Sequence, residues 1–147
     1  MASNFHAVAA IVEQSGVLII GPSGAGKTEL AFALIAAARL AGRFARLVGD
    51  DQLFLRAAAG RLVAAVPPSI AGLAEVRGFG PVGVEHEPQM VVDLLVRIVP
   101  AQQAPRFAEP AKLEIAGVAV PMLELATENA ERAAAAILAF LRVAPFR

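Results

Sequence analysis

The chain has 147 residues, a formal net charge of zero from 13 basic and 13 acidic residues, and no cysteine. The balanced charge argues against binding to nucleic acid or to an anionic membrane, and the lack of cysteine excludes disulfides, thiol catalysis and cysteine-ligated zinc. No apolar run approaches the ~20 residues of a membrane span, and no basic segment precedes an apolar one at the N-terminus, so we expect a cytoplasmic protein. The length predicts a single domain, 1–147.

The first predicted elements are two apolar strands followed by a helix. Phe5–Val12 predicts a strand, and Glu13–Gly16 predicts a turn into a second strand, Val17–Ile20. The stretch Thr28–Leu40 is rich in helix formers and carries apolar residues at helical spacing. A glycine-rich loop therefore connects a buried strand to a helix.

This loop matches G-x-x-x-x-G-K-[ST], the pattern of the phosphate-binding P-loop. Its glycines let consecutive backbone N–H groups converge on phosphates, Lys27 reaches the β- and γ-phosphates, and the Thr28 hydroxyl can ligate Mg²⁺. The sequence therefore predicts a site for a nucleoside triphosphate with Mg²⁺. The residues expected to bind the nucleotide are Gly21, Pro22, Ser23, Gly24, Ala25, Gly26, Lys27 and Thr28.

A pair of acids follows the next predicted strand. Phe44–Val48 predicts a core strand that ends in Gly49-Asp50-Asp51. Open α/β sheets bind ligands at the carboxyl ends of their strands, so these acids are expected beside the phosphates. One carboxylate can serve Mg²⁺ or its waters while the other accepts a hydroxyl proton, a division that phosphoryl transfer to an alcohol requires. A solvated Asp-Asp turn is the alternative.

A glycine-rich segment comes after a predicted hairpin. The hairpin consists of Leu53–Leu55 and Arg61–Val66, and the segment runs from Glu75 to Val84. Its glycines permit close or unusual turns, so we expect the segment to border a site. Glu75 can provide a second acid on the metal side, and Arg77 a cation for the migrating phosphoryl group. A surface ion pair is the alternative.

The rest of the chain predicts a strand, a loop, a small hairpin and a helix. These are Val91–Val99 for the strand, Ala101–Pro110 for the loop, and Leu113–Ile115 with Val118–Val120 for the hairpin. The helix is predicted to begin with Thr127 as its N-cap and Glu128 in its first turn, and to run through Leu141. Together the elements predict an α/β fold with a mixed central sheet flanked by helices.

One histidine and three segments resemble the catalytic domain of HPr kinase/phosphorylase. They are His6, the loop Gly21–Thr28 followed by Glu29, the strand end Gly49-Asp50-Asp51, and Glu75-Val76-Arg77-Gly78-Phe79-Gly80. That family's last segment reads Glu-Ile/Val-Arg-Gly-hydrophobic-Gly. The resemblance covers nearly the whole chain and implies a short form with only the C-terminal catalytic domain. It also implies a P-loop kinase fold related in its core to phosphoenolpyruvate carboxykinase.

The resemblance implies an activity and an assembly. Members of the family use ATP and Mg²⁺ to phosphorylate a serine of the phosphocarrier HPr in the phosphotransferase system. Many also remove that phosphate by phosphorolysis, releasing pyrophosphate. An HPr-like phosphocarrier is therefore the expected partner, and a homo-oligomer, a hexamer by resemblance, is the expected assembly.

The resemblance also assigns roles to single residues. It makes Lys27 the phosphate ligand, and Thr28 and Glu75 the Mg²⁺ ligands. Asp51, supported by Asp50, becomes the base that takes the serine proton and the acid that returns it. The full catalytic set is His6, Lys27, Asp50, Asp51, Arg77 and Arg106.

Some positions depart from the family pattern. Arg106, in Pro105-Arg106-Phe107, is the candidate for the family's downstream catalytic arginine, although its loop carries no distinctive motif. Gly49 stands where the family usually has alanine, and the segment Pro81–Val84 is less apolar than the usual continuation. Two other functions stay open at this point, namely a P-loop kinase of small molecules and an ATP-binding sensor without catalysis. The sensor is disfavoured because the acids and Arg77 are all present.

Overall fold

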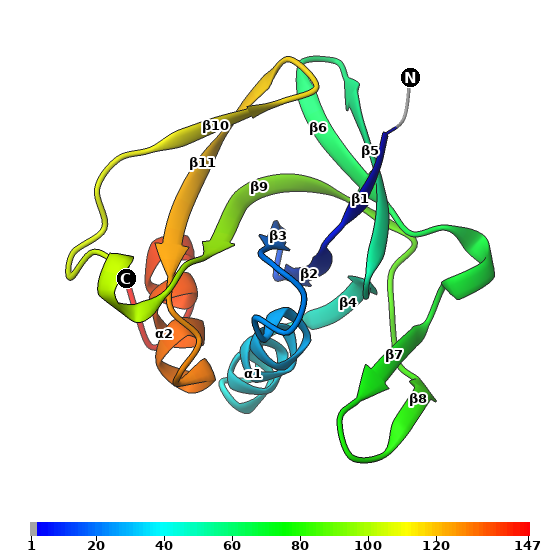
Figure 1. Ribbon diagram of the computed structural model, residues 1–147, viewed down its shortest axis with the longest axis horizontal. Helices are drawn as coiled ribbons and strands as arrows, with labels where there is room; N and C mark the ends of the chain where they lie inside the picture. Colours follow the sequence, from blue (N-terminus) through cyan, green and yellow to red (C-terminus); the bar gives the residue numbers. More distant parts are fainter. Residues whose placement is uncertain (1–2) are drawn as a thin grey trace.

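The computed structural model describes residues 3–147 and combines a curled nine-stranded sheet, a separate two-stranded hairpin and two α-helices (Figure 1). The neighbouring strands of the large sheet are, in order, β1 (Ser3–His6), β5 (Gln52–Ala58), β6 (Arg61–Ala65), β9 (Gln89–Ile98), β3 (Ser15–Ile20), β2 (Val8–Val12) and β4 (Ala45–Gly49). The other elements are β10 (Lys112–Ile115), β11 (Val118–Leu125), the hairpin strands β7 (Leu73–Val76) and β8 (Gly80–Gly83), and the helices α1 (Lys27–Leu40) and α2 (Ala130–Leu141).

Three adjacent strands run parallel and bring distant parts of the chain to one edge. β9 pairs in parallel with β3 on one side and with β11 on the other, and β10 extends the sheet by pairing with β11. In this register Ile20 lies opposite Arg97, and Leu125 lies opposite Ile98. The loop after β3 and the segment after β11 therefore leave the sheet at the same edge, on either side of β9.

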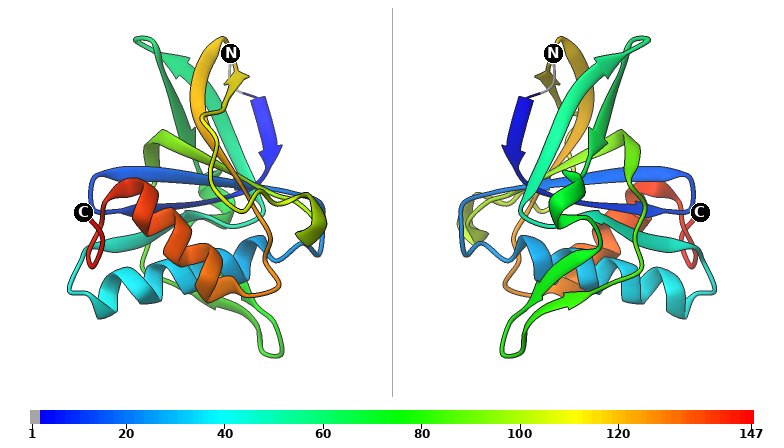
Figure 2. Two further views of the ribbon diagram at one scale, coloured as in Figure 1. Left: turned by 90° about the vertical axis from the view of Figure 1, so that its left-hand side faces the viewer. Right: turned by 90° about the vertical axis from the view of Figure 1, so that its right-hand side faces the viewer.

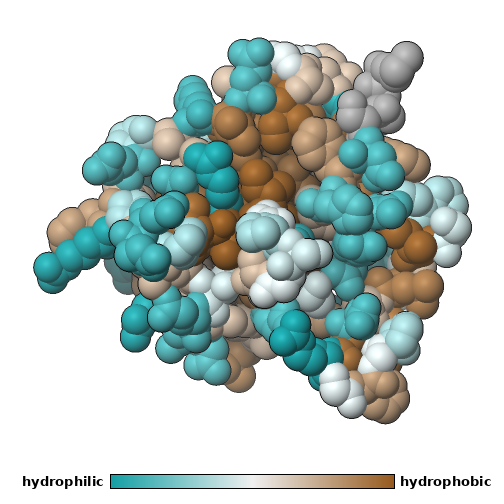
Figure 3. Space-filling model, viewed as in Figure 1, coloured by the Kyte–Doolittle hydropathy of each residue, from teal (hydrophilic) through white to brown (hydrophobic). Residues whose placement is uncertain are grey.

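The sheet buries both of its faces. Strands alternate their side chains, so on β3 Ile19 belongs to one core and Leu18 to the other, and on β9 Leu94 and Leu95 divide in the same way. This explains why these strands read as continuous apolar runs. The second core is enclosed by β5 and β6, and Figure 3 shows hydrophobic residues between the β5–β6 and β10–β11 hairpins, where this core reaches the surface.

Both helices lie on the same side of the sheet (Figure 2). Leu30 and Leu34 of α1 and Ile137 of α2 pack in one cluster against Ile19 and its neighbours. The predicted α/β fold with a mixed sheet is confirmed, but the sheet is covered by helices on one side rather than flanked on both. Its other face is closed by the curl of the sheet itself.

Most predicted elements are confirmed, with two corrections. The predicted strand Phe5–Val12 is two strands, β1 and β2, because the chain turns from one part of the sheet to another at Ala7. The predicted N-cap of the last helix is wrong: Asn129, not Thr127, caps α2, and its side chain accepts a hydrogen bond from the Arg132 N–H. Within residues 3–147, no helix has the length and apolar character that crossing a membrane requires.

Candidate active site

The phosphate loop connects the buried end of β3 to the first turn of α1. Gly24 and Gly26 have φ angles of 78° and 92°, which glycine adopts without the penalty of a side chain. Gly26 is the N-cap of α1. The N–H groups of the first helical turn, which have no partner within the helix, therefore lie at the loop. The Lys27 ammonium donates to the carbonyls of Gly21 at 2.9 Å and Pro22 at 3.2 Å, which folds this cation back over the loop.

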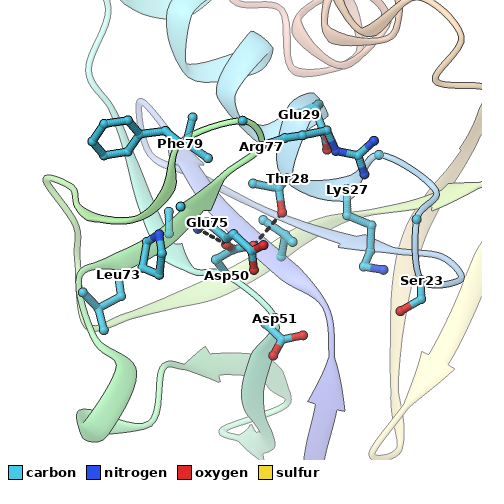
Figure 4. A pocket seen from close by; sticks show the side chains of 18 of the residues that line it. Ser23, Lys27, Thr28, Glu29, Asp50, Asp51, Leu73, Glu75, Arg77 and Phe79 are labelled. Carbon is cyan, nitrogen blue, oxygen red and sulfur yellow. Dashed lines mark hydrogen bonds and ion pairs between the residues drawn. The ribbon is translucent and has the colours of Figure 1, made fainter.

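A cavity of about 640 Å³ opens beside this loop. Its walls come from three parts of the chain: the phosphate loop, the end of β4 and the β7–β8 hairpin (Figure 4). The polar side chains that line it are Ser23, Lys27, Thr28, Glu29, Asp50, Asp51, Glu75 and Arg77. A nucleotide fits a volume of this size, which lies in the ordinary range for small-molecule sites.

The two adjacent acids engage different partners. Asp50 Oδ1 accepts a hydrogen bond from the Thr28 hydroxyl at 2.7 Å, and its Oδ2 accepts one from the Glu75 backbone N–H at 3.0 Å. Asp51 lies with its Oδ1 3.3 Å from His6 Nδ1. Asp51 also has a φ of 88°, a left-handed conformation that is uncommon outside glycine. This turn of the backbone directs the second carboxylate away from the first.

The backbone around His6 and Asp51 explains how the pair forms. The strand break at Ala7 lies opposite the junction between β4 and β5, and the Ala7 N–H donates to the Asp51 carbonyl at 3.1 Å. His6 and Gln52 then begin the antiparallel β1–β5 pairing. The same break that divides the predicted first strand therefore places His6 beside Asp51.

The β7–β8 hairpin forms the wall opposite the phosphate loop. Arg77 Nε lies 3.5 Å from Glu29 Oε1, and the Arg77 side chain is 80% exposed. Such an exposed pair contributes little stability. Phe79 at the same end of the hairpin is 78% exposed.

The structure brings together most of the site residues expected from the sequence. Lys27, Thr28, Asp50, Asp51, Glu75 and Arg77 all line the cavity, and His6 joins them through Asp51. Arg106 does not line it: its guanidinium lies 5.4 Å from the centre of the Phe107 ring, in the loop that follows β9. Among the described residues, 3–147, no three His, Cys, Asp or Glu side chains group as metal ligands.

The glycine before the acids has a packing role. A Cβ atom on Gly49 would lie 2.7 Å from Leu53 Cδ2 and 3.2 Å from Val66 Cγ2. In this chain, alanine at position 49 would therefore require the end of the Leu53 side chain to move and Val66 to shift slightly. Glycine leaves room for these two side chains beneath the acid pair.

The contact between Thr127 and the phosphate loop was not predicted from the sequence. Its hydroxyl donates to the Ala25 carbonyl of the phosphate loop. The signal available in the sequence was indirect, since it required knowing that β11 lies parallel to β9 and β9 parallel to β3. A threonine two residues after β11 looks like a helix cap when that topology is unknown.

Comparison with known proteins identifies the family of this chain. The model of the HPr Serine kinase C-terminal domain matches residues 1–142. The chain belongs to this family. The solved structure of the Hpr(Ser) kinase/phosphatase from Coxiella burnetii aligns with a TM-score of 0.80 and 25% sequence identity, covering 95% of this chain and 96% of that one.

Curated relatives match a shorter part of the chain. The HPr kinase/phosphorylase of Clostridium botulinum is 38% identical over 82 residues, which is 56% of this chain and 25% of that protein. The enzyme of the same name from Bordetella petrii is 43% identical over 76 residues, or 51% of this chain and 23% of its own length. Each match therefore spans about a quarter of the relative's length.

Proposed function

We propose that this chain is an ATP- and Mg²⁺-dependent protein serine kinase that acts on an HPr-like phosphocarrier. The observation that carries the proposal is the division of labour between adjacent acids: Asp50 is bonded to the phosphate-loop Thr28, whereas Asp51 is held by His6. Phosphoryl transfer to an alcohol needs one acid on the metal side and one at the acceptor hydroxyl. Family membership and the names of the relatives support the choice of a protein serine as acceptor.

The residues around the loop suit a triphosphate. The glycines at 24 and 26 and the first turn of α1 present backbone N–H groups, and Lys27 adds a compact positive charge beside them. On arrival of the γ-phosphate, the Lys27 ammonium exchanges its two carbonyl partners for phosphate oxygens. This exchange trades neutral acceptors for charged ones, which form stronger hydrogen bonds.

The donor atoms at the end of β4 suit magnesium. The Thr28 hydroxyl and the Asp50 carboxylate are 2.7 Å apart, and Glu75 lines the same cavity. All three offer hard oxygen atoms, the ligands that Mg²⁺ prefers, so these residues would hold the ion when it is bound. When bound, Mg²⁺ supplies positive charge that neutralises the phosphate oxygens during transfer.

Asp51 is the base in this proposal. Its carboxylate accepts the proton of the acceptor serine hydroxyl while the serine oxygen forms a bond to the γ-phosphorus and the bond to the β–γ bridging oxygen breaks. ADP leaves, and the product is a phosphoserine. His6, whose Nδ1 lies 3.3 Å from Asp51 Oδ1, is the side chain placed to orient this carboxylate. In phosphorolysis, an oxygen of inorganic phosphate bonds to the phosphoserine phosphorus while the bond from that phosphorus to the serine oxygen breaks, Asp51 returns a proton to the serine oxygen, and pyrophosphate leaves.

Transfer to purified HPr tests the proposal directly. The chain is incubated with γ-labelled ATP, Mg²⁺ and HPr, and we expect label on an HPr serine, with Asp51→Asn binding ATP but transferring label about 10²-fold more slowly. Label on a small alcohol instead of HPr would establish the small-molecule kinase. ATP binding without any transfer would establish the sensor.

The homo-oligomer implied by the family stays a prediction, which light scattering of the same preparation tests.

A further inference from the structure

The segment after β11 reaches the phosphate loop because of the parallel strands. Leu125 lies opposite Ile98 on β9, whose other neighbour is β3, and the phosphate loop starts directly after β3. Thr127, two residues beyond Leu125, thereby meets a loop that lies 102 residues earlier in the sequence. The contact is a product of the sheet topology rather than of local sequence.

Thr127 contacts one particular peptide of the loop, the one between Ala25 and Gly26. Its hydroxyl donates to the Ala25 carbonyl, and the contact is partly buried. On the next residue, a Cβ added to Gly26 would lie 3.2 Å from the Thr127 hydroxyl oxygen and 3.5 Å from its Cβ. Thr127 therefore packs against the side of the loop from which this peptide projects its carbonyl.

The direction of that carbonyl fixes the direction of an N–H group. A trans peptide is planar, so the Ala25 C=O and the Gly26 N–H point in opposite directions. Holding the carbonyl against Thr127 turns the Gly26 N–H away from Thr127, and Gly26 lines the cavity. The left-handed φ of 92° at Gly26 is the kind of backbone conformation that gathers successive N–H groups into an anion-binding nest.

We propose that Thr127 is a positioning residue for phosphate binding: its hydroxyl holds the Ala25–Gly26 peptide in the orientation that presents the Gly26 N–H to the nucleotide phosphates. The hydroxyl is available for this role because Asn129 caps α2 instead. Without it, this peptide loses its hydrogen bond to the segment after β11, and ordering the peptide lowers the free energy gained on phosphate binding. The inference rests on the proposed nucleotide site.

The test compares binding of ATP and of inorganic pyrophosphate to the whole chain by isothermal titration calorimetry. Thr127→Val keeps the shape of the side chain and removes the hydroxyl, and we expect it to weaken both ligands in parallel, by about tenfold, the effect of one lost hydrogen bond. Thr127→Ser restores the hydroxyl and should return both dissociation constants close to those of the unchanged protein. If ATP and pyrophosphate lose affinity by the same factor, the lost contact acts on the binding of phosphates, which the two ligands share.

Asn129→Ala is the matched control in the same segment. It removes the α2 cap, so it should lower the melting temperature while leaving both dissociation constants unchanged. Equal binding by Thr127→Val and the unchanged protein would overturn the inference, as would failure of Thr127→Ser to rescue or equal weakening by Asn129→Ala. If the unchanged protein bound neither ATP nor pyrophosphate, the proposed function would fail first, which is a separate result.

Discussion

The two walls of the cavity are built differently. Hydrogen bonds restrain the phosphate loop at several points. The Lys27 ammonium donates to a carbonyl of the loop, the Thr127 hydroxyl donates to the Ala25 carbonyl, and the Thr28 hydroxyl donates to Asp50. The β7–β8 hairpin reaches the same cavity with the exposed Arg77 and Phe79 at its end. The phosphate loop is thus the more restrained wall of the cavity, while the opposite wall presents accessible side chains.

Asp50 joins the two walls. One of its oxygens accepts from Thr28 on the phosphate loop and the other accepts from the backbone of Glu75 on β7. A carboxylate with both oxygens occupied in this way is suited to positioning its neighbours. Asp51 has no such bridge and is 70% exposed, which leaves it accessible to a proton donor on the incoming substrate.

The largest effect is expected on the restrained wall, at Lys27. Lys27→Ala replaces the cation over the phosphates by a methyl group, so turnover of ATP should fall by about 10²-fold or more. Steady-state ADP release measures the change, and circular dichroism checks that the fold persists. Lys112→Ala on β10 removes the chain's other lysine outside the cavity and should leave turnover unchanged. Full activity of Lys27→Ala would contradict the phosphate-binding role of this loop.

The second effect separates the bridging acid from the exposed one. Asp51→Asn should reduce transfer to the protein serine by about 10²-fold while ATP still binds, because a general base is lost. Asp50→Asn should instead raise the Mg²⁺ concentration required for half-maximal rate. Rates over a Mg²⁺ series, with ATP binding measured separately, distinguish the two. The opposite pattern, with the base-like defect in Asp50→Asn, would exchange the assigned roles.

Local patterns explain what the sequence predicted well. The phosphate loop, α1 and the β5–β6 hairpin depend on residues close together in the chain, such as the glycines before Lys27 and the turn at Ala59-Gly60, and all were predicted near their observed positions. The acid pair was also predicted at a strand end, because Asp50 and Asp51 directly follow an apolar run. Local chemistry was sufficient for these elements.

Topology explains what the sequence did not predict. The contact between Thr127 and Ala25 depends on which strands are neighbours, and the one-sided arrangement of the helices depends on the curl of the sheet. Arg106 had the right charge for the site, but its loop places the guanidinium over Phe107 rather than in the cavity. Residue type alone did not determine any of these positions.

A smaller effect is expected on the exposed wall, at Arg77. If its guanidinium meets the migrating phosphoryl group, Arg77→Ala should slow both phosphorylation of HPr and phosphorolysis, each by about tenfold, because both reactions move that group between the serine oxygen and a phosphate oxygen. Measuring both directions with one preparation tests this. Arg106→Ala, outside the cavity, should change neither rate. Full activity of Arg77→Ala would make its contact with Glu29 a surface ion pair only.

The smallest effect concerns the segment that returns from the hairpin to β9. Hydrogen bonds from Arg39 and then from Arg46 lower the pKa of the Glu85 carboxyl below its ordinary value of 4.5, and these arginines belong to α1 and β4. A carboxyl whose pKa is lowered on folding contributes stability above its unfolded pKa, and this contribution is lost as the pH falls through the folded value. Because the group is exposed, the contribution is small.

Glu85→Gln should therefore lower the urea midpoint slightly at pH 7, and the difference from the unchanged protein should disappear as the pH is taken well below 4.5. Glu87→Gln is the matched comparison, because Glu87 pairs with Arg46 at the longer distance of 3.6 Å, against 2.7 Å for Glu85. We expect it to change the midpoint less. A difference for Glu85→Gln that persisted at low pH would mean that Glu85 contributes to stability through packing rather than through its charge.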